Sequence, residues 1–370
     1  EYGNYSGGIV NVVTKSGGNQ VHGTVFEFLR NTSLDARSFF SPQRSVYRQN
    51  QFGGTIGGPI KKNQMFYFAD YQATRHAQGV DTGIIPVPTL ANRTGDLSSL
   101  ASDLTGQVSG PYLAQLLTQK LGYGVKENEP YYIPGCVSSS QCVFPNALIP
   151  QRAWAAPSKS LLPYIPTPNV GPDTFSTAAR NKIVRDDKGS YRTDFSSDRY
   201  GMISGYYFFD DYNLQNPYPT GQGGANVPGF GALNLGRSQL ISLGHTKALN
   251  PFTVNEFRVS FMRTANNVGQ PYEGVGPSLL SQGFASGNQS GIVPLAPKIE
   301  GIMNVEFNAF HIGVPITNLT QANNTYNISD NLSRIWGTHT FKTGFQANFS
   351  QVNVNPNPTA NGAFTFFGSE

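Results

Sequence analysis

The chain has 370 residues, enough for one large domain or two ordinary ones, and only 13% of them are charged, about half of the usual share in a soluble domain. The net charge of +4 is spread along the sequence without a block of lysine and arginine, which argues against a nucleic-acid partner, and no apolar run approaches the ~18 residues of a transmembrane helix. Phe (25) and Tyr (18) are abundant beside Gly (41) and Pro (25), a composition that favours strands and turns over helices.

Short runs with strand character recur along the whole chain, and the last complete one alternates most clearly. In that run Phe345 and Phe349 share one face, whereas Lys342, Gln346 and Asn348 share the other. A tenth run begins near residue 362. The nine complete runs lie at 21–30, 48–58, 64–75, 189–195, 200–210, 237–248, 253–264, 324–335 and 338–350.

The connections between these runs alternate between long and short. In an antiparallel up-and-down sheet, successive connections leave from opposite edges, so the alternation predicts long loops at one rim and tight turns at the other. Outer-membrane β-barrels are built in this way, and their closed ladders satisfy every backbone group inside lipid. The long connections are 31–47, 76–188, 211–236, 265–323 and 351–361, and the short ones are 58–63, 196–199, 249–252 and 335–338.

The connection over 76–188 is too long for a plain loop. Residues 110–122 within it predict a short amphipathic helix ended by glycine, and the remainder is rich in proline, so we expect a partly ordered, surface-exposed cap. Cys136 and Cys142 lie six residues apart in a polar stretch with no histidine nearby. A local disulfide in an oxidising compartment fits this spacing better than a metal site, and two free thiols are the alternative.

Residues that could carry chemistry are scattered. No histidine pair has metal-ligand spacing, and phosphate-binding and nucleophile motifs are absent, so we expect no enzyme and no cofactor. Asp210-Asp211 could hold a cation in an outer loop, but a solvated turn is the simpler interpretation, as it is for residues 186–189. The candidate functional residues are therefore those on the predicted polar, lumen-facing side of the strands: Glu27, Glu256, Arg258, Lys342, Gln346 and Asn348.

The first nineteen residues, EYGNYSGGIVNVVTKSGGN, resemble the closing segment of the plug domain of TonB-dependent receptors. The runs 21–31, 50–60 and 65–71 look like the first three barrel strands of the Oar-like subgroup, which carries a carboxypeptidase-regulatory-like domain. An ordinary Gly-rich hairpin is the alternative for the first segment taken alone. The residues that carry the motif are Gly3, Gly7, Gly8, Asn11, Thr14, Gly17 and Gly18.

The resemblance implies the end of a plug domain at 1–19 and the first part of a transmembrane β-barrel at 20–370, in the bacterial outer membrane. Such barrels have roughly 22 strands, so about ten strands imply an open, curled antiparallel sheet. The chain starts at Glu1 without Met or a signal peptide and ends at Glu370, so we expect a fragment of a longer protein.

The function that the resemblance implies is import of a large scarce solute, with membrane lipid and the TonB energy-transducing complex as partners. The solute itself cannot be read from the loops. Two alternatives stand beside it: a surface-exposed adhesion or structural barrel without active transport, and a soluble β-sandwich that acts as a binding module.

Overall fold

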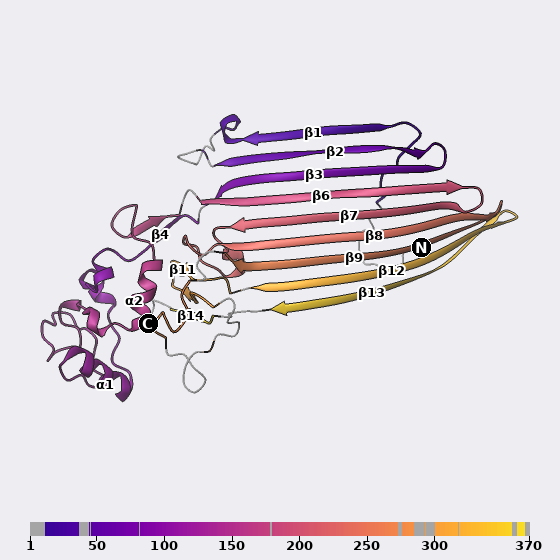
Figure 1. Cartoon of the computed structure of the whole chain (residues 1–370). Coiled ribbons are helices and arrows are strands. Elements are labelled where there is room, and N and C mark those ends of the chain that lie inside the picture. The colour runs from indigo at the N-terminus through magenta and orange to yellow at the C-terminus, as the bar shows by residue number, and fades with distance from the viewer. Residues whose placement is uncertain are drawn as a thin grey trace.

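The computed structural model describes residues 12–36, 44, 46–80, 82–177, 180–272, 276–284, 293, 300–316, 318–356 and 361–366. Its main feature is one sheet of nine antiparallel strands in the order β1-β2-β3-β6-β7-β8-β9-β12-β13, and each strand pairs with its neighbours along the chain (Figure 1). The two outer strands do not pair with each other, so the sheet stays open, as predicted. The strands are β1 His22–Asn31, β2 Tyr47–Lys61, β3 Met65–Val80, β6 Arg180–Ser197, β7 Gly201–Asn216, β8 Ala232–Asn250, β9 Thr253–Pro271, β12 Leu319–Trp336 and β13 His339–Pro356.

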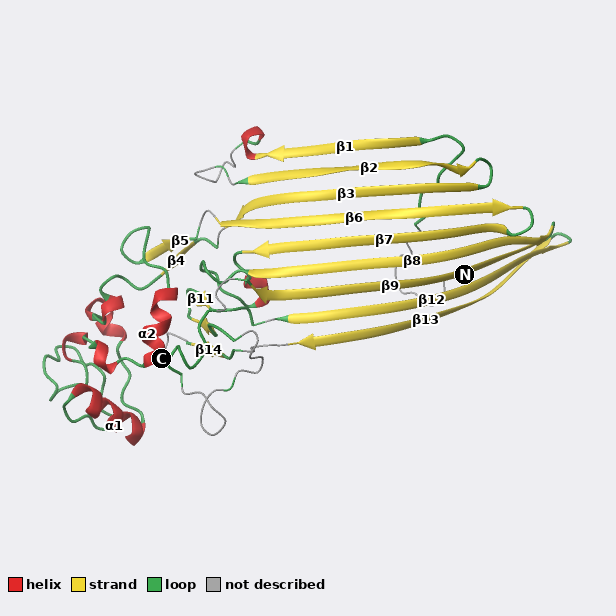
Figure 2. Ribbon diagram, in the orientation of Figure 1, coloured by secondary structure: helices red, strands yellow, loops and turns green. Residues whose placement is uncertain are grey.

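The predicted alternation of loop lengths is confirmed. The connections 62–64, 198–200, 251–252 and 337–338 are tight turns at one rim, whereas 32–46, 81–179, 217–231 and 272–318 leave from the opposite rim. Figure 2 shows the tight turns at the right-hand ends of the strands and the loops and helices at the left. Asn63 and Gly337 adopt the left-handed conformation that such turns need, each with φ 62°.

The strands are longer than the alternation of residues predicts. The strand expected at 189–195 begins at Arg180, so the acidic residues Asp186 and Asp187, expected in a turn, lie inside β6. Asp210 and Asp211 likewise lie inside β7 and not in a turn. Strands of 16–19 residues rise about 53–65 Å, whereas a tilted strand crosses a bilayer in about 9–11 residues, so the distal parts of these strands project beyond it and no longer need to be apolar.

The long loops fold into a cap at their rim. The cap contains α1 Gly110–Leu121 and α2 Ala156–Leu161. Gly122 caps the C-terminus of α1, as predicted. A strand forms near the predicted tenth position, but β14 Ala363–Thr365 pairs in parallel with β10 Asn304–Glu306 and so lies outside the main sheet. β11 His311–Ile312 completes that small sheet, and β4 Ile84–Pro86 pairs with β5 Thr174–Ser176. The 3-10 turns are Thr32–Leu34, Asn92–Thr94, Ser98–Asp103, Pro145–Ala147, Gln151–Ala153, Leu162–Tyr164 and Thr220–Gln222.

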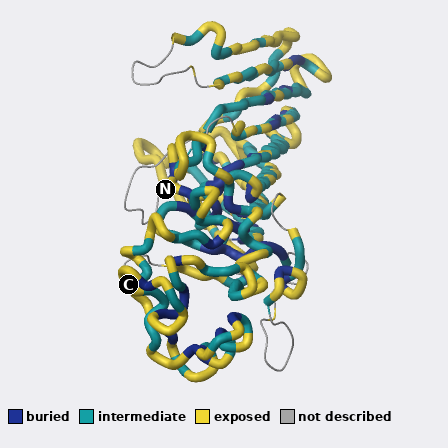
Figure 3. The backbone as a smooth tube through the Cα atoms, turned by 90° about the vertical axis from the view of Figure 1, so that its left-hand side faces the viewer, coloured by how far each residue is buried: buried dark blue, intermediate teal, exposed yellow. Residues whose placement is uncertain are grey.

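The hydrophobic cores lie in the cap and not in the sheet. One cluster of buried side chains forms around Phe230, Met303 and Ile312, and a second forms around Leu121 and Val143, and every member of both lies outside the nine strands. Figure 3 shows buried residues gathered where the loops pack, while the strands are mostly half-buried or exposed. Among the described residues the nine-stranded sheet is therefore a single layer that no second sheet faces, which makes the β-sandwich alternative wrong.

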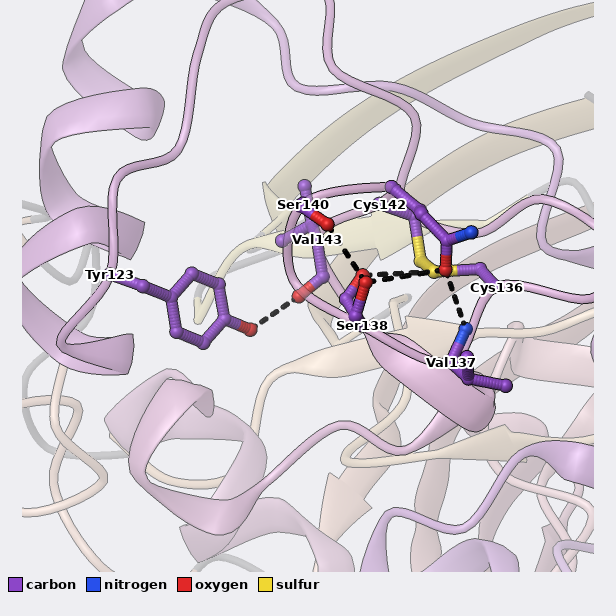
Figure 4. Close-up of a disulfide and its surroundings, with 8 residues drawn as sticks. Tyr123, Cys136, Val137, Ser138, Ser140, Cys142 and Val143 are labelled. Carbon is purple, nitrogen blue, oxygen red and sulfur yellow. Dashed lines mark hydrogen bonds between the residues drawn. A yellow bond between two sulfur atoms is a disulfide. The ribbon is translucent and has the colours of Figure 1, made fainter.

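Cys136 and Cys142 form a disulfide in the cap, next in the chain to Val143 of the second cluster (Figure 4). Next to it the Tyr123 hydroxyl donates a hydrogen bond to the Val143 carbonyl at 2.5 Å, and burial raises the pKa of that phenol, which keeps it a donor. A disulfide that closes a loop of this length lowers the conformational entropy of the unfolded cap, and this stabilises the folded cap by about 2 kcal/mol. The described part of the chain contains no helix long and apolar enough to cross a membrane.

Candidate functional site

The register of the sheet assigns each strand residue to one of two faces, because directly opposed residues in an antiparallel ladder point to the same side. One face is apolar over the half of the sheet near the tight turns, and we call it the apolar face. A single row across it runs through Ile56, Ala69, Tyr191, Tyr207, Ile241, Phe261, Tyr326 and Phe349.

No part of the chain that the structure describes forms a layer over the apolar face. Leu243 is 53% exposed, and Phe345 and Phe349 are each 65% exposed. Soluble monomers seldom expose continuous apolar patches of more than a few hundred Å², and lipid is the solvent in which such a surface is stable. The face therefore has the character of the outer wall of a membrane barrel.

Further toward the long loops the same face becomes charged. Asp187 accepts hydrogen bonds from the Tyr71 hydroxyl and the Arg75 guanidinium, each at 2.6 Å, and from Arg185 at 2.7 Å. In the same row, Arg237 lies 3.6 Å from Asp211, the ladder partner of Asp187. These ion pairs explain why residues that predict a turn remain in strands, since their charges are compensated on the sheet surface. Within the described ranges, no three His, Cys, Asp or Glu side chains gather as a metal ion would require.

The opposite face is mostly polar, with Phe68, Phe208 and Leu240 among its apolar residues, and we call it the lumen face. Five of the six candidate residues lie on it: Glu256, Arg258, Lys342, Gln346 and Asn348 all face the same side through their partners on β12. The Arg258 guanidinium bonds Glu256 at 2.5 Å, and Asn327 donates to Asn348. Whether these residues contact a solute stays a prediction.

Glu27 does not join this group. Its ladder partner is Phe52, and the row continues through Ala73 to Asp187, so it lies on the apolar face at the level where that face becomes charged. β1 is apolar on both sides, with Val25 and Phe26 on opposite faces, and hydrophobic alternation therefore cannot orient this strand.

The N-terminal segment that resembles a plug end, which we call the plug-end segment, meets the lumen face at Arg192. Its guanidinium donates to the Thr14 hydroxyl at 2.6 Å and to the Thr14 carbonyl at 3.1 Å, and it forms a two-pronged ion pair with Asp194 with both bonds at 2.8 Å. Both side chains are largely buried, with 19% and 9% of their surfaces exposed. No spacing in the sequence marks Arg192, because its partner lies 178 residues away. Of the remaining motif residues, Gly3, Gly7, Gly8 and Asn11 lie outside the described residues.

Two further contacts hold the segment against the sheet. A Cβ atom on Gly17 would lie 2.2 Å from the Tyr67 carbonyl oxygen, so only glycine permits this approach, whereas one on Gly18 would meet open space. Asn19 then exchanges two hydrogen bonds with Asn63 in the first tight turn, at 2.7 and 2.8 Å. The segment thus runs along the lumen side of β2, β3 and β6 before it enters β1.

Comparison with known proteins shows the family of this chain. Residues 13–370 match the model of the family described as outer membrane beta barrel domain. A 79-residue segment, 19% of this chain, is 34% identical to the TonB-dependent transporter Oar of Myxococcus xanthus, and it spans 7% of the length of that protein. The crystal structure of the Ralstonia pickettii toluene transporter TbuX aligns over 91% of this chain and 77% of its own, at 8% identity and a TM-score of 0.20. The chain belongs to the outer membrane beta-barrel domain family and is a bacterial outer-membrane protein.

Proposed function

We propose that this chain forms the end of the plug domain, residues 1–19, and the first part of the barrel, residues 20–370, of a TonB-dependent transporter that imports a large scarce solute. The contact of Thr14 with Arg192 on the lumen face carries the proposal, because it seats the segment that resembles a plug end on the polar side of the sheet. The local similarity to the Oar transporter supports the same assignment.

The chemistry of that contact suits a plug that must move. The polar contacts of Thr14 with Arg192 are hydrogen bonds, Arg192 keeps its ion pair with Asp194 inside β6, and each of these groups can be rehydrated in a water-filled lumen. A hydrogen bond to a charged group contributes only about 1.5–3 kcal/mol net, so a pull transmitted through TonB has a small barrier to overcome at this point. The barrel itself then acts by binding and conduction, and no catalytic step is part of the proposal.

A surface-binding barrel without transport is the second candidate. The observation that favours it is the cap over 82–177, which has its own buried cluster and a disulfide and is larger than a simple gate requires. Such a cap could serve adhesion or assembly at the cell surface. The two candidates differ in their need for the energy supplied by TonB.

Growth on single nutrients separates the candidates. A strain that lacks the full-length gene is compared with the wild type on iron chelates, cobalamin, peptides and glycans supplied one at a time at limiting concentration. We expect slower growth on one of them, the same defect in a strain that lacks TonB, and recovery only when both genes are present. Full recovery by the transporter gene in the absence of TonB, or normal growth on every nutrient, contradicts the proposal.

A further inference from the structure

A cavity of about 580 Å³ lies within the cap, between α2 and the small sheet β11-β10-β14. Its size is in the range of pockets that enclose small organic ligands. We propose that this cavity binds an uncharged, flat, apolar group, and we call it the cap pocket. Its lining residues include Trp154, Leu161, Met303, Phe307, Phe364 and Phe366.

One wall of the cap pocket is a ladder of nearly parallel aromatic rings. Phe284 and Phe364 have ring centroids 6.3 Å apart and planes within 13°, and Phe307 and Phe366 have centroids 5.5 Å apart and planes within 14°. Phe364 and Phe366 join the two pairs at 6.4 Å and 17°. The near-parallel rings form one apolar wall, against which a planar ligand can stack in the same orientation.

The described lining residues include no charged side chain. The Trp154 indole already donates its N–H to the Ile149 carbonyl at 3.0 Å, which leaves Asn92 and Ser158 as the polar side chains of the lining. A charged ligand would lose its hydration here without gaining a counter-ion, and that loss is unfavourable. The lining therefore selects for uncharged molecules and against anionic chelates.

The pocket is held open by the packing behind it. Met303 and Ile312 form its floor and are fully buried in the first hydrophobic cluster of the cap. Lys120 of α1 donates to the Trp154 carbonyl at 2.8 Å from behind the opposite wall. Phe364 and Phe366, 41% and 54% exposed, leave the cavity accessible from outside. A pocket that exists before the ligand arrives avoids the cost of ordering its walls.

This inference deepens the proposed function, because it rests on the cap being the outer receptor surface and names the chemical class that it captures first. Binding at the cap does not need TonB or uptake. The absence of ligand binding at the cap would therefore leave the transport proposal standing, and the absence of TonB-dependent uptake would leave ligand binding at the cap standing.

The test is fluorescence quenching of Trp154 in the full-length protein in detergent micelles, taken as the difference from its Trp154→Phe variant. The probe is 4-nitrotoluene, a neutral flat quencher, and its anionic counterpart is 4-nitrobenzoate. We expect saturable quenching by 4-nitrotoluene with a Kd of about 10–300 µM, and only linear, collisional quenching by 4-nitrobenzoate.

Variants distinguish binding of the probe in the cap pocket from its partition into the detergent micelle. Phe366→Glu, which places a charge at the mouth, should weaken binding by about tenfold or more, and Phe366→Ala by about threefold. Tyr112→Glu, on the exposed side of α1 and 77% exposed, should leave the Kd unchanged. Linear quenching by 4-nitrotoluene, equal saturation by the anion, or identical Kd values for the variants at residues 366 and 112 would overturn the inference.

Discussion

Replacing Leu243 by arginine should lower the free energy of unfolding of the full-length barrel by about 2–4 kcal/mol, because the side chain faces lipid near the middle of the apolar face. Leu243 is 53% exposed, and its ladder partners Gly205 and Val259 lie in the same apolar region. The measurement is reversible urea unfolding in phosphatidylcholine vesicles, followed by the shift of the folded band on unheated gels.

Ser242→Arg is the matched control, since Ser242 is the preceding residue on β8 and points to the lumen face. An arginine there enters a polar, hydrated environment and should change the stability by less than about 1 kcal/mol. Equal losses for the two variants would contradict the difference between the faces, and a larger loss for Ser242→Arg would mean that the faces have been assigned the wrong way round.

Replacing Arg192 by methionine should release the plug-end segment and lower the stability of the complete protein by about 3 kcal/mol. The change removes both bonds to Thr14 and leaves the Asp194 carboxylate, with 9% of its surface exposed, without its ion-pair partner. The release is measured with a membrane-impermeant maleimide on a Thr14→Cys background, in which the bond from Arg192 to the backbone carbonyl of residue 14 is kept, and we expect labelling in outer membranes to rise at least about tenfold.

Two further variants identify the cause of that release. Arg192→Lys keeps the charge but loses the planar fork that bonds Asp194 and Thr14 together, so its labelling should be intermediate. A double change of Arg192 to Met and Asp194 to Leu removes the uncompensated carboxylate and should recover most of the stability while labelling stays high. Labelling of the Arg192→Met variant at the level of the unchanged protein would refute the role of Arg192 as the plug contact.

The architecture followed from the sequence because loop length and strand order are local properties. The alternation between turns such as 337–338 and loops such as 81–179 is visible without any contact information. The ends of some strands could not be predicted, because their residues are charged and do not alternate between apolar and polar. In β6, for example, ion pairs with Arg75 and Arg185 keep Asp187 in the strand.

The site could be predicted only in part. The polar face of β9 and β13 could be predicted because each of these strands has one clearly apolar face. β1 has apolar residues on both faces, and for this reason Glu27 was assigned to the wrong face. Arg192 and the cap pocket depend on contacts between residues far apart in the sequence. The aromatic ladder, for example, brings Phe284 beside Phe364, and no local pattern carries that information.

The central claim is that alternate residues of one strand contact lipid and water, respectively. Nitroxide labels placed singly at residues 256–261 of β9 in the full-length protein, with oxygen and a nickel chelate as relaxing agents, test it directly. We predict higher oxygen accessibility at Phe257, Val259 and Phe261 and higher nickel accessibility at Glu256, Arg258 and Ser260. Accessibilities without a period of two, or with the two sets reversed, would contradict the account.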